Sequence, residues 1–379
     1  MSERKRQPMS HPVECDVIIV GGGIHGVAAA YFLSKKGLSV VLLERDTCGR
    51  CASGVNAGGV RTLGRVLPEI PLSLASSQLW QTLDFLHGFD GAFVRTGQIK
   101  VAESEQDMQI LRERRDLLAK HGFHHEKLID KDQVRQIVPA IAAHVEGALW
   151  VSTDGFAFPY LIVQAFAHQA RKYGAQIREQ SPVNAIEKSG NHWRVSTPEH
   201  TIAGKKLLLC AGVWTAELAR LCGEHIPVTP GGLMLMVTQR VPHFINPVLG
   251  ATSRGLSFKQ FANGTVVIGG ALECEADARQ NHAELDFSRL ANSARIVTDL
   301  FPFLKNVSIT RAWSGIDGYA PDHTSIIGPS ASVDNLYYAC GFSSSGFQLG
   351  PASGQYLAEL ITDHAPNPLH QGLLPARFC

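Results

Sequence analysis

Three glycines and one acid near the start of the chain have the residue types and the spacing that bind a dinucleotide. Gly21, Gly23 and Gly26 follow the pattern GxGxxG, and Glu44 lies 18 residues after the last of them. The first glycine allows a tight turn, the second lets the backbone approach a pyrophosphate, and the third lets a helix pack against its strand. Glu44 is placed to accept hydrogen bonds from a ribose. The spacing therefore predicts a pyrophosphate at the N-terminus of a helix.

The residues around this motif predict the elements that must position it. Val17–Val20 is a run of four β-branched residues, which predicts a short buried strand ending at the first glycine. The alanine-rich segment 27–36 predicts a helix, and 38–43 predicts a second buried strand that ends at the acid. A lone GxGxxG is often only a turn, but the complete unit favours a dinucleotide site over a structural glycine loop. Three neighbours are also expected to contact the nucleotide: Ile24, His25 and Arg45.

A second glycine-rich stretch, residues 48–61, offers small residues and hydrogen-bonding groups to a planar ligand. Small residues let the backbone lie against a flat ring, and serine and asparagine side chains can bond to it. This loop would lie along a flavin if the first motif binds a flavin dinucleotide, with contacts from Ser53, Asn56, Ala57 and Gly58. Arg61 is a candidate for contact with the flavin or with a substrate carboxylate, and a solvated or structural arginine is the alternative.

The same stretch contains a CxxC pair, Cys48 and Cys51. Such a pair can be redox-active or can supply half of a metal site, but no second CxxC or histidine pair at ligand spacing accompanies it. Incidental loop cysteines are the favoured interpretation, and no metal ligands are predicted. The eight cysteines of the chain suggest no disulfide framework, which favours a reducing cytoplasm.

Composition and charge exclude some classes of function. The chain has 379 residues, 45% of them hydrophobic, and a formal net charge of +1, so there is no electrostatic reason to expect nucleic acid as a partner. We expect no transmembrane segment, because no apolar run reaches the ~18 residues of a membrane span. No apolar segment follows the basic residues 4–6 as it would in a secretory signal. Residues 1–12 are predicted to be a disordered tail.

The middle of the chain predicts two amphipathic helices, over residues 72–86 and 103–120, without any nucleotide-binding motif. We interpret this part as the beginning of a second domain. On the second helix, the apolar residues expected to be buried are Ile110, Leu111, Leu117 and Leu118.

Further along, strands are predicted over residues 234–237, 255–261 and 265–270, the last two joined by an Asn-Gly turn that signals a hairpin. Ser257 and Lys259 alternate with less polar residues on the second of these strands. One face of the strand is therefore polar enough to line a pocket, and an outward-facing lysine is the alternative.

Two later segments repeat the order strand, glycine turn, helix. One runs from the strand at 207–210 into residues 211–214, and the other from the strand at 336–340 through a glycine-containing loop into a helix at 351–362. Each presents another helix N-terminus, so we expect both segments to rejoin the first domain. The nucleotide contacts predicted in this part of the chain are Val183, Ala211, Gly212, Trp214, Gly346, Phe347 and Gln348.

We therefore predict an α/β fold whose two domains are interleaved along the chain. A Rossmann-like nucleotide-binding domain takes residues 13–84, 150–222 and 318–379. A substrate-binding α+β domain with an antiparallel sheet takes residues 85–149 and 223–317.

Together these motifs resemble the FAD-dependent amino-acid oxidase family, typified by D-amino-acid oxidase, glycine oxidase and sarcosine oxidase. The resemblance covers nearly the whole chain and rests on GGGIHG with Glu44, ASGVNAGGVR, LLLCAGVWT, VVIGGALE, PDHTSIIGP and GFSSSGFQLGPASG. The chain is most similar to the flavoprotein components of three hetero-oligomeric bacterial enzymes: opine oxidase, hydrogen cyanide synthase and D-hydroxyproline dehydrogenase.

The resemblance implies a non-covalent FAD and a partner subunit, with an additional FMN or iron–sulfur centre at or in that partner. It also implies oxidation of the C–N bond of an amino-acid-like amine, such as an opine, D-hydroxyproline or glycine, to an imine by hydride transfer to flavin N5. Because the cofactor carries the difficult step, the lack of an evident acid–base pair does not argue against an enzyme. The alternatives are a free-standing, peroxide-producing oxidase and a flavin-binding assembly factor.

One departure from the family concerns the substrate carboxylate. Single-chain sarcosine oxidase has a lysine that binds this carboxylate at the position where the present chain has Gln348. The carboxylate must then be held by another cation, or recognition must differ; the candidate cations are Arg61, Arg254, Lys259 and Arg311. The catalytic candidates are Arg61, Lys259 and Gln348.

Overall fold

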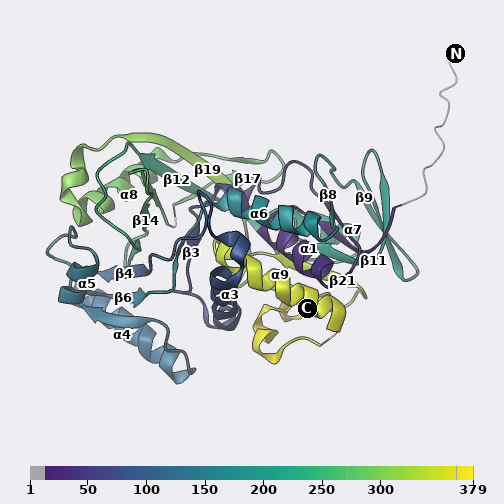
Figure 1. Ribbon diagram of the computed structural model, residues 1–379, viewed down its shortest axis with the longest axis horizontal. Coiled ribbons are helices and arrows are strands. Elements are labelled where there is room, and N and C mark those ends of the chain that lie inside the picture. Colours follow the sequence, from purple (N-terminus) through teal and green to yellow (C-terminus); the bar gives the residue numbers. More distant parts are fainter. Residues whose placement is uncertain (1–12, 271, 364, 379) are drawn as a thin grey trace, which may run out of the picture.

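The computed structural model describes residues 13–270, 272–363 and 365–378. The tail predicted for residues 1–12 lies outside this described part. Figure 1 shows an elongated molecule with two halves, one around helices α1, α6 and α9 and the other around α4, α5 and α8.

The first half is built on an eight-stranded sheet with the path β20-β21-β11-β1-β2-β8, to which β10 and β9 are added beside β11. Strands β2, β1, β11 and β21 pair in parallel, and the last four residues of β1 are buried β-branched residues. The strands of this sheet are β1 Val13–Val20, β2 Val40–Leu43, β8 Gln176–Arg178, β9 Ala185–Ser189, β10 His192–Ser196, β11 Thr201–Leu209, β20 Ile326–Pro329 and β21 Leu336–Cys340.

Helices α1 and α9 pack closely against one another over this sheet because glycine lies at their contact. A Cβ atom at Gly350 would lie 2.3 Å from Ile24, and one at Gly354 would lie 2.5 Å from Ala28. Helix α9 begins at Gly346, five residues before the predicted start. The helices of this half are α1 Ile24–Lys35, α2 Ala52–Val55, α3 Ile70–Thr82, α6 Pro159–Lys172, α7 Thr215–Leu221 and α9 Gly346–Asp363.

The second half is built on a nine-stranded sheet with the path β16-β12-β15-β14-β13-β4-β6-β5, and β19 pairs with β12. All of its pairings are antiparallel except that of β13 with β4. The strands are β4 Gln98–Ala102, β5 Lys127–Asp130, β6 Gly147–Val151, β12 Thr229–Thr238, β13 Val248–Ala251, β14 Ser257–Gln260, β15 Val266–Gly269, β16 Glu273–Cys274 and β19 Ile309–Tyr319. The predicted fold class, α/β with a largely antiparallel second sheet, is confirmed.

One face of the second sheet is covered by α8 Phe287–Leu300 and α5 Lys131–Ile137, whose apolar residues join one core with the sheet. Helix α4, Glu105–Lys120, buries Met108, Leu111 and Leu118. The prediction that Ile110 and Leu117 are buried is wrong, since they are 44% and 41% exposed. The helix packs on the sheet along a single stripe, and these two residues lie one position away from it.

The domain division by residue number stays a prediction. Two of its boundaries cut strands of the second sheet, because β6 continues to Val151 and β19 continues to Tyr319. The remaining short strands are β3 Gly59–Val60, which pairs with β7 Gly155–Phe156, and β17 Ala276–Asp277, which pairs with β18 His282–Ala283.

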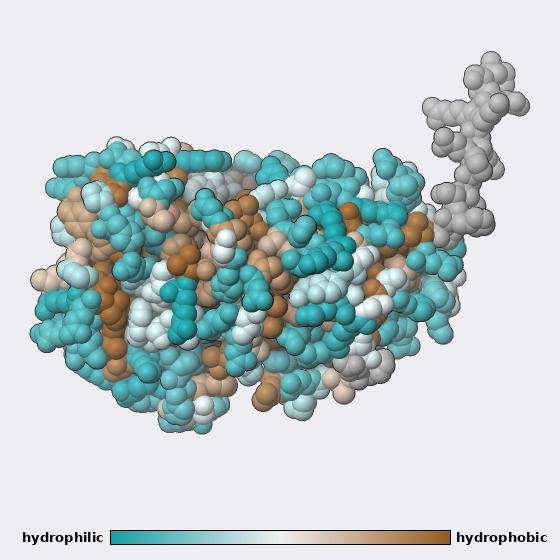
Figure 2. Space-filling view, in the orientation of Figure 1, coloured by the Kyte–Doolittle hydropathy of each residue, from teal (hydrophilic) through white to brown (hydrophobic). Residues whose placement is uncertain are grey.

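The described residues contain no helix that is long and apolar enough to cross a membrane. Figure 2 shows hydrophilic residues over most of the visible face, with apolar residues in smaller separate groups.

Candidate active site

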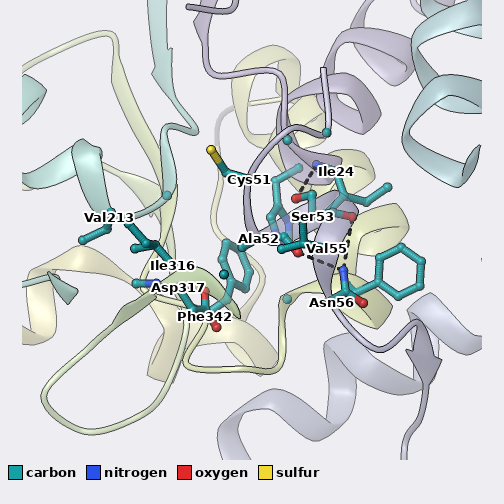
Figure 3. Close-up of a pocket in the computed structure, with 18 of the residues that line it drawn as sticks. Ile24, Cys51, Ala52, Ser53, Val55, Asn56, Val213, Ile316, Asp317 and Phe342 are labelled. Carbon is teal, nitrogen blue, oxygen red and sulfur yellow. Dashed lines mark hydrogen bonds between the residues drawn. The ribbon is translucent and has the colours of Figure 1, made fainter. Parts of the chain in front are cut away.

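A long cavity runs between the two sheets and collects most of the residues predicted from the sequence. Its wall includes the N-terminus of α1, the loop before β3, the segment after β11 and the loop before α9. Figure 3 shows Val213, Ile316 and Asp317 on one side of this cavity and Ser53 and Asn56 on the other. The predicted residues on the wall are Gly21, Gly23, Ile24, His25, Glu44, Arg45, Ser53, Asn56, Ala57, Arg61, Val183, Ala211, Gly212, Trp214, Gly346, Phe347 and Gln348.

The GxGxxG turn has the close packing that its spacing predicts. Gly21 has a φ of +110°, and a Cβ atom there would lie 2.4 Å from the carbonyl oxygen of Cys210. Gly26 does not line the cavity, but a Cβ atom there would lie 2.0 Å from the carbonyl oxygen of Gly21. The third glycine thus serves the contact between helix and strand, and the first shapes the turn that opens to the cavity.

The acid at the end of β2 is held against this turn. Glu44 accepts hydrogen bonds from the backbone N–H groups of Gly22 (2.6 Å) and Asp46 (2.9 Å). Burial raises the pKa of its carboxyl group above the ordinary range. The carboxylate therefore lies at the cavity wall beside the glycines, where a ribose hydroxyl can donate to it.

The N-terminus of α1 is partly satisfied by the loop that precedes β3. The N–H of Ile24 donates to Ser53 Oγ at 3.0 Å, so not all of the N–H groups predicted to be free for a phosphate are free. Asn56 uses its amide within the loop: its Nδ2 donates to the carbonyl of Ala52 at 2.9 Å, and its Oδ1 accepts from the N–H of Gly58 at 2.7 Å. Asn56 therefore holds the shape of the loop, and its neighbours face the cavity.

Gly58 does not line the cavity, although Ala57 and Gly59 do. Its φ is +75°, and a Cβ atom would lie 2.0 Å from the carbonyl oxygen of Ala157. A side chain at this position would push the loop away from β7. The role of Gly58 is thus to make the turn.

At the nucleotide end, the guanidinium of Arg45 lies 3.7 Å from the centroid of the Trp214 ring. Such stacking holds the arginine flat against the tryptophan. Val183 and Gly212 line the same cavity. The end of the cavity next to Glu44 thus has both flat and polar surfaces, which suit the adenosine part of a dinucleotide.

A buried histidine links α1 to the loop before α9. The ring of His25 stacks on Phe342, with 3.5 Å between the ring centroids, and its Nδ1 lies 2.5 Å from Ser353 Oγ. Burial lowers the pKa of His25 to about 3, so the ring is neutral at ordinary pH. The ring therefore joins the two segments through packing and a hydrogen bond, without adding charge.

At the opposite end, the partly exposed Arg61 and the buried Arg65 form a cationic wall. Arg61 donates from Nη1 to the carbonyl of Leu63 at 2.9 Å. Arg65 donates to the carbonyls of Arg61 (3.1 Å) and Ser345 (2.9 Å) and to Gln348 Oε1 (3.2 Å). Burial lowers the pKa of Arg61 below its ordinary range and that of Arg65 to about 9.

Gln348 uses its side-chain amide and its backbone carbonyl in hydrogen bonds to Arg65 and to helix α3. Its Oε1 also accepts from Ser73 Oγ at 3.0 Å, its Nε2 donates to the carbonyl of Ser73 at 2.8 Å, and its backbone carbonyl accepts from Ser76 and Trp80. The side chain is completely buried. Gln348 therefore positions Arg65, and its part in catalysis stays a prediction.

Three other cations predicted as carboxylate holders are not on the cavity wall. Arg254 is engaged by Glu103 and Asp299, and Arg311 is exposed. Lys259 is 1% exposed, which contradicts the outward-facing alternative. Its Nζ has no hydrogen-bond partner among the described residues and lies 5.9 Å from the centroid of the Phe156 ring, while Ser257 on the same strand does line the cavity. Burial lowers the pKa of Lys259 to about 7.

The cavity fits FAD in its glycine turn, its acidic strand end and its length between two sheets. The close backbone approach at Gly21 and the carboxylate of Glu44 suit a pyrophosphate and a ribose. Within the described ranges, no group of three or more histidine, cysteine, aspartate or glutamate residues is placed to hold a metal ion. Cys48 and Cys51 are free thiols, with the former buried.

Residues 16–360 match the family model DAO, described as FAD dependent oxidoreductase. The chain belongs to this DAO family. The predicted resemblance and the predicted class, an FAD-dependent oxidoreductase, are thereby confirmed.

Two relatives and one solved structure show how far the likeness of this DAO-family chain extends. The HcnC subunit of hydrogen cyanide synthase from Pseudomonas aeruginosa is 26% identical over 96% of this chain and 96% of its own length. The beta subunit of sarcosine oxidase from Rhizobium meliloti is 27% identical over 95% of this chain and 87% of its own length. The crystal structure of L-proline dehydrogenase from P. horikoshii superposes with a TM-score of 0.89 at 26% identity, covering 97% of this chain and 98% of that one.

In this DAO-family site, the polar residues on the cavity wall that sequence reasoning missed include Arg65, Gln98 and Asp317. Arg65 lies four residues after Arg61 and could have been found from that spacing. Asp317 accepts from the backbone N–H groups of Gly318 (2.8 Å) and Ser344 (2.7 Å), and burial raises its pKa. Gln98 carried no local signal, since it begins a strand that was not predicted.

Proposed function

We propose that the chain is the catalytic subunit of a hetero-oligomeric dehydrogenase that oxidises the C–N bond of an amino-acid-like amine to an imine. Bound FAD would supply the redox chemistry by accepting a hydride from the carbon next to the nitrogen. The chain binds and orients the amine and keeps water away from the reacting carbon. Opines are the substrates that the sequence resemblance favours, with D-hydroxyproline and glycine as further candidates.

The bonding of Arg61 is the observation that supports a substrate with a carboxylate group. Arg61 is a partly exposed cation on the cavity wall, and within the described part of the chain only one of its donors makes a hydrogen bond. Its remaining donors are free for a ligand, and planar guanidinium groups match carboxylates. Its acidic neighbours already have partners: Asp154 the backbone of Thr62 and Leu63, Glu126 the side chain of Arg114, and Glu69 the side chain of Arg65 and the N–H of Ser325. A substrate carboxylate would complete the pairing.

Burial at this end favours the neutral form of a bound amine. The cations Arg61, Arg65 and the half-buried Lys100 are offset by the nearby carboxylates of Asp154, Glu69 and Glu126. Burial lowers the pKa of an ammonium group. The amine then keeps the lone pair that must form the C=N bond, so a dedicated general base is not required.

Two further observations support a partner subunit. Two of the relatives are named as subunits, and the present chain matches nearly their whole length. Several large apolar side chains are also exposed where residues 89–94 meet the start of α6: Phe89, Val94, Phe158, Tyr160 and Leu161. Exposed apolar groups of this kind mark interaction surfaces. We place an additional FMN or iron–sulfur centre at or in the partner, and the assembly in the cytoplasm.

Anaerobic reduction of the flavin tests this proposal. The purified protein with FAD should lose its yellow colour when mixed with octopine, D-hydroxyproline, glycine or N-methylglycine. Reoxidation by an artificial dye, but only slowly by air, would support a dehydrogenase. Rapid reoxidation by air with peroxide formation would instead support the free-standing oxidase, and no bleaching by any amine would support the assembly factor.

A further inference from the structure

Gln98 is a buried polar side chain on the cavity wall whose acceptor atom is left without a partner. The residue is 7% exposed and lines the cavity, and its Oε1 has no hydrogen bond among the described residues. Buried polar atoms are almost always paired, and leaving one unpaired reduces stability. Oε1 itself is closed to solvent, and a half-turn of the amide group, which exchanges Oε1 with Nε2, presents the acceptor to a ligand in the cavity.

The strand register places Gln98 on the face of the second sheet that covers the cavity. Gln98 starts β4 and pairs with Val248 of β13, and both line the cavity. Directly opposite residues on neighbouring strands point to the same side of a sheet. Ile99, the next residue, belongs instead to the core under α8. The side chain of Gln98 is therefore fixed on a rigid strand and aimed toward the bound ligand.

Asp154 ties Gln98 to Arg61. The backbone carbonyl of Asp154 accepts from the N–H of Gly97 at 2.8 Å, next to Gln98. Its carboxylate accepts from the N–H groups of Thr62 (2.9 Å) and Leu63 (3.0 Å), directly after Arg61. One buried residue thus holds the two chain segments that carry the cation and the acceptor.

We propose that Gln98 accepts a hydrogen bond from the N–H group of the substrate amine, while Arg61 binds the carboxylate. This inference rests on the proposed function. In an α-amino acid only one carbon separates the nitrogen from the carboxylate. The guanidinium of Arg61 and the amide of Gln98, on adjoining walls, can therefore bind both groups of one molecule. The substrate class is then a primary or secondary amine, and tertiary amines are disfavoured.

The proposed contact is consistent with the bonding changes of the reaction. FAD, when bound, would accept the hydrogen of the C–H bond together with its electron pair, and the nitrogen lone pair would form the C=N bond. Holding the N–H at Gln98 leaves that lone pair free. The resulting iminium loses its proton to water, and hydrolysis of the imine follows in solution.

A pair of non-reacting ligands tests the contact without turnover. Pyrrole-2-carboxylate has an N–H next to its carboxylate, and furan-2-carboxylate has an oxygen in the same place. Calorimetric titration of the FAD-loaded protein should show about tenfold tighter binding of the pyrrole. Gln98→Met, which removes the acceptor with little change in volume, should bring the two affinities within twofold. Gln98→Glu, which keeps an acceptor, should retain the preference.

Kinetics provide the second measurement. Anaerobic bleaching by N-methylglycine should slow about tenfold in Gln98→Met, whereas bleaching by N,N-dimethylglycine should stay within twofold. The FAD content and melting temperature of each variant report whether it folds. Equal binding of pyrrole and furan by the unmodified protein, or a preference that survives in Gln98→Met, would overturn the inference. A preference for the pyrrole in a protein that no amine bleaches would overturn the proposed function alone.

Discussion

The two ends of the cavity recognise their ligands by different means. At the nucleotide end, the turn at Gly21–Gly26, the N-terminus of α1 and the acid Glu44 come from one continuous segment, to which Val183, Gly212 and Trp214 are added from elsewhere in the chain. At the proposed substrate end, Arg61, Gln98 and Ser257 come from three distant segments and present polar side chains.

The two ends also differ in how many of their buried polar groups have hydrogen-bond partners. The acid at the nucleotide end already has two N–H partners. Gln98 at the substrate end lines the cavity, and its Oε1 is buried with no hydrogen-bond partner in the part of the chain that the structure describes. Lys259 Nζ, Arg178 Nη1 and Thr215 Oγ1 are also buried and unpaired there, but these residues do not line the cavity. Unpaired buried groups reduce stability, so one on a cavity wall indicates a place where binding, and not folding, supplies the partner. The nucleotide end is thus organised for shape, and the substrate end for a ligand that completes it.

The largest effect should come from breaking the shape of the nucleotide end. Gly26→Ala would place a Cβ atom 2.0 Å from the carbonyl oxygen of Gly21, so α1 must move away from β1. We expect a loss of more than about 3 kcal/mol in the free energy of unfolding, and no retained FAD. Urea unfolding and FAD absorbance measure both. Gly59→Ala, whose Cβ atom would have no described neighbour within 4 Å, is the control for stability, and an FAD-saturated Gly26→Ala protein would contradict the comparison.

The next largest effect concerns the unpaired lysine behind the substrate end. The pKa of Lys259 is lowered to about 7 by burial, whereas the unfolded lysine stays protonated up to about pH 10.4. Between these values the unfolded state binds more protons, so the contribution of Lys259 to the free energy of unfolding rises with pH. Lys259→Met should therefore stabilise the protein most at and below pH 7, on the order of 3 kcal/mol, with the gain shrinking toward pH 10.

Urea unfolding at pH 7 and pH 10 measures this difference. Lys127→Met, at an exposed position on β5 of the same sheet, serves as the control and should show no change with pH. A Lys259→Met protein that is destabilised at both pH values would show that the ammonium has a partner and would remove this contrast between the two ends.

A smaller effect is expected where the substrate end meets its ligand. Arg61→Ala should lower kcat/KM by about 30-fold, or about 2 kcal/mol, because it removes the charged partner of the carboxylate. FAD affinity should stay within twofold, which separates this end of the cavity from the other. Steady-state kinetics and FAD titration provide the measurements. A normal KM with normal turnover would remove Arg61 from the site.

The smallest effect is expected from one carboxylate at the nucleotide end, Glu44. Glu44→Ala should weaken FAD binding about tenfold, or about 1.5 kcal/mol, through the lost hydrogen bonds to a ribose. Titration of the apoprotein with FAD measures this, and kcat at saturating FAD should not change. Glu44→Gln keeps an acceptor and is the conservative control. Unchanged FAD affinity in the alanine variant would argue against the ribose contact.

The contrast also explains what the sequence could predict. The glycine turn, β1, α1 and Glu44 follow from local spacing, so their positions could be read directly from residues 16–44. Arg61 was found because it ends a loop of small residues. The buried face of α3 is polar at Ser73 and Ser76. The reason is clear only from the structure, in which both serines bind Gln348.

Gln98 illustrates what could not be predicted. Its importance depends on the pairing of β4 with β13, which lies about 150 residues away, and on one atom that finds no partner among the described residues. Neither the strand pairing nor the unpaired atom can be inferred from the residues next to Gln98 in the sequence. Likewise, the sequence does not determine whether Lys259 points outward or inward, because a one-residue change of strand register reverses the direction of its side chain.

The bridge from Arg65 to Ser345 and Gln348 sets an order of events during synthesis on the ribosome. A nascent chain that has emerged only as far as residue 335 contains the whole glycine turn but lacks β21 and two of the acceptors of Arg65, the Ser345 carbonyl and the Gln348 side chain. Helix α1 would then expose to chaperones the side that Gly350 and Gly354 later cover. Stable capture of the cofactor must therefore wait for the translation of α9, even though its first contact is made by residues translated long before.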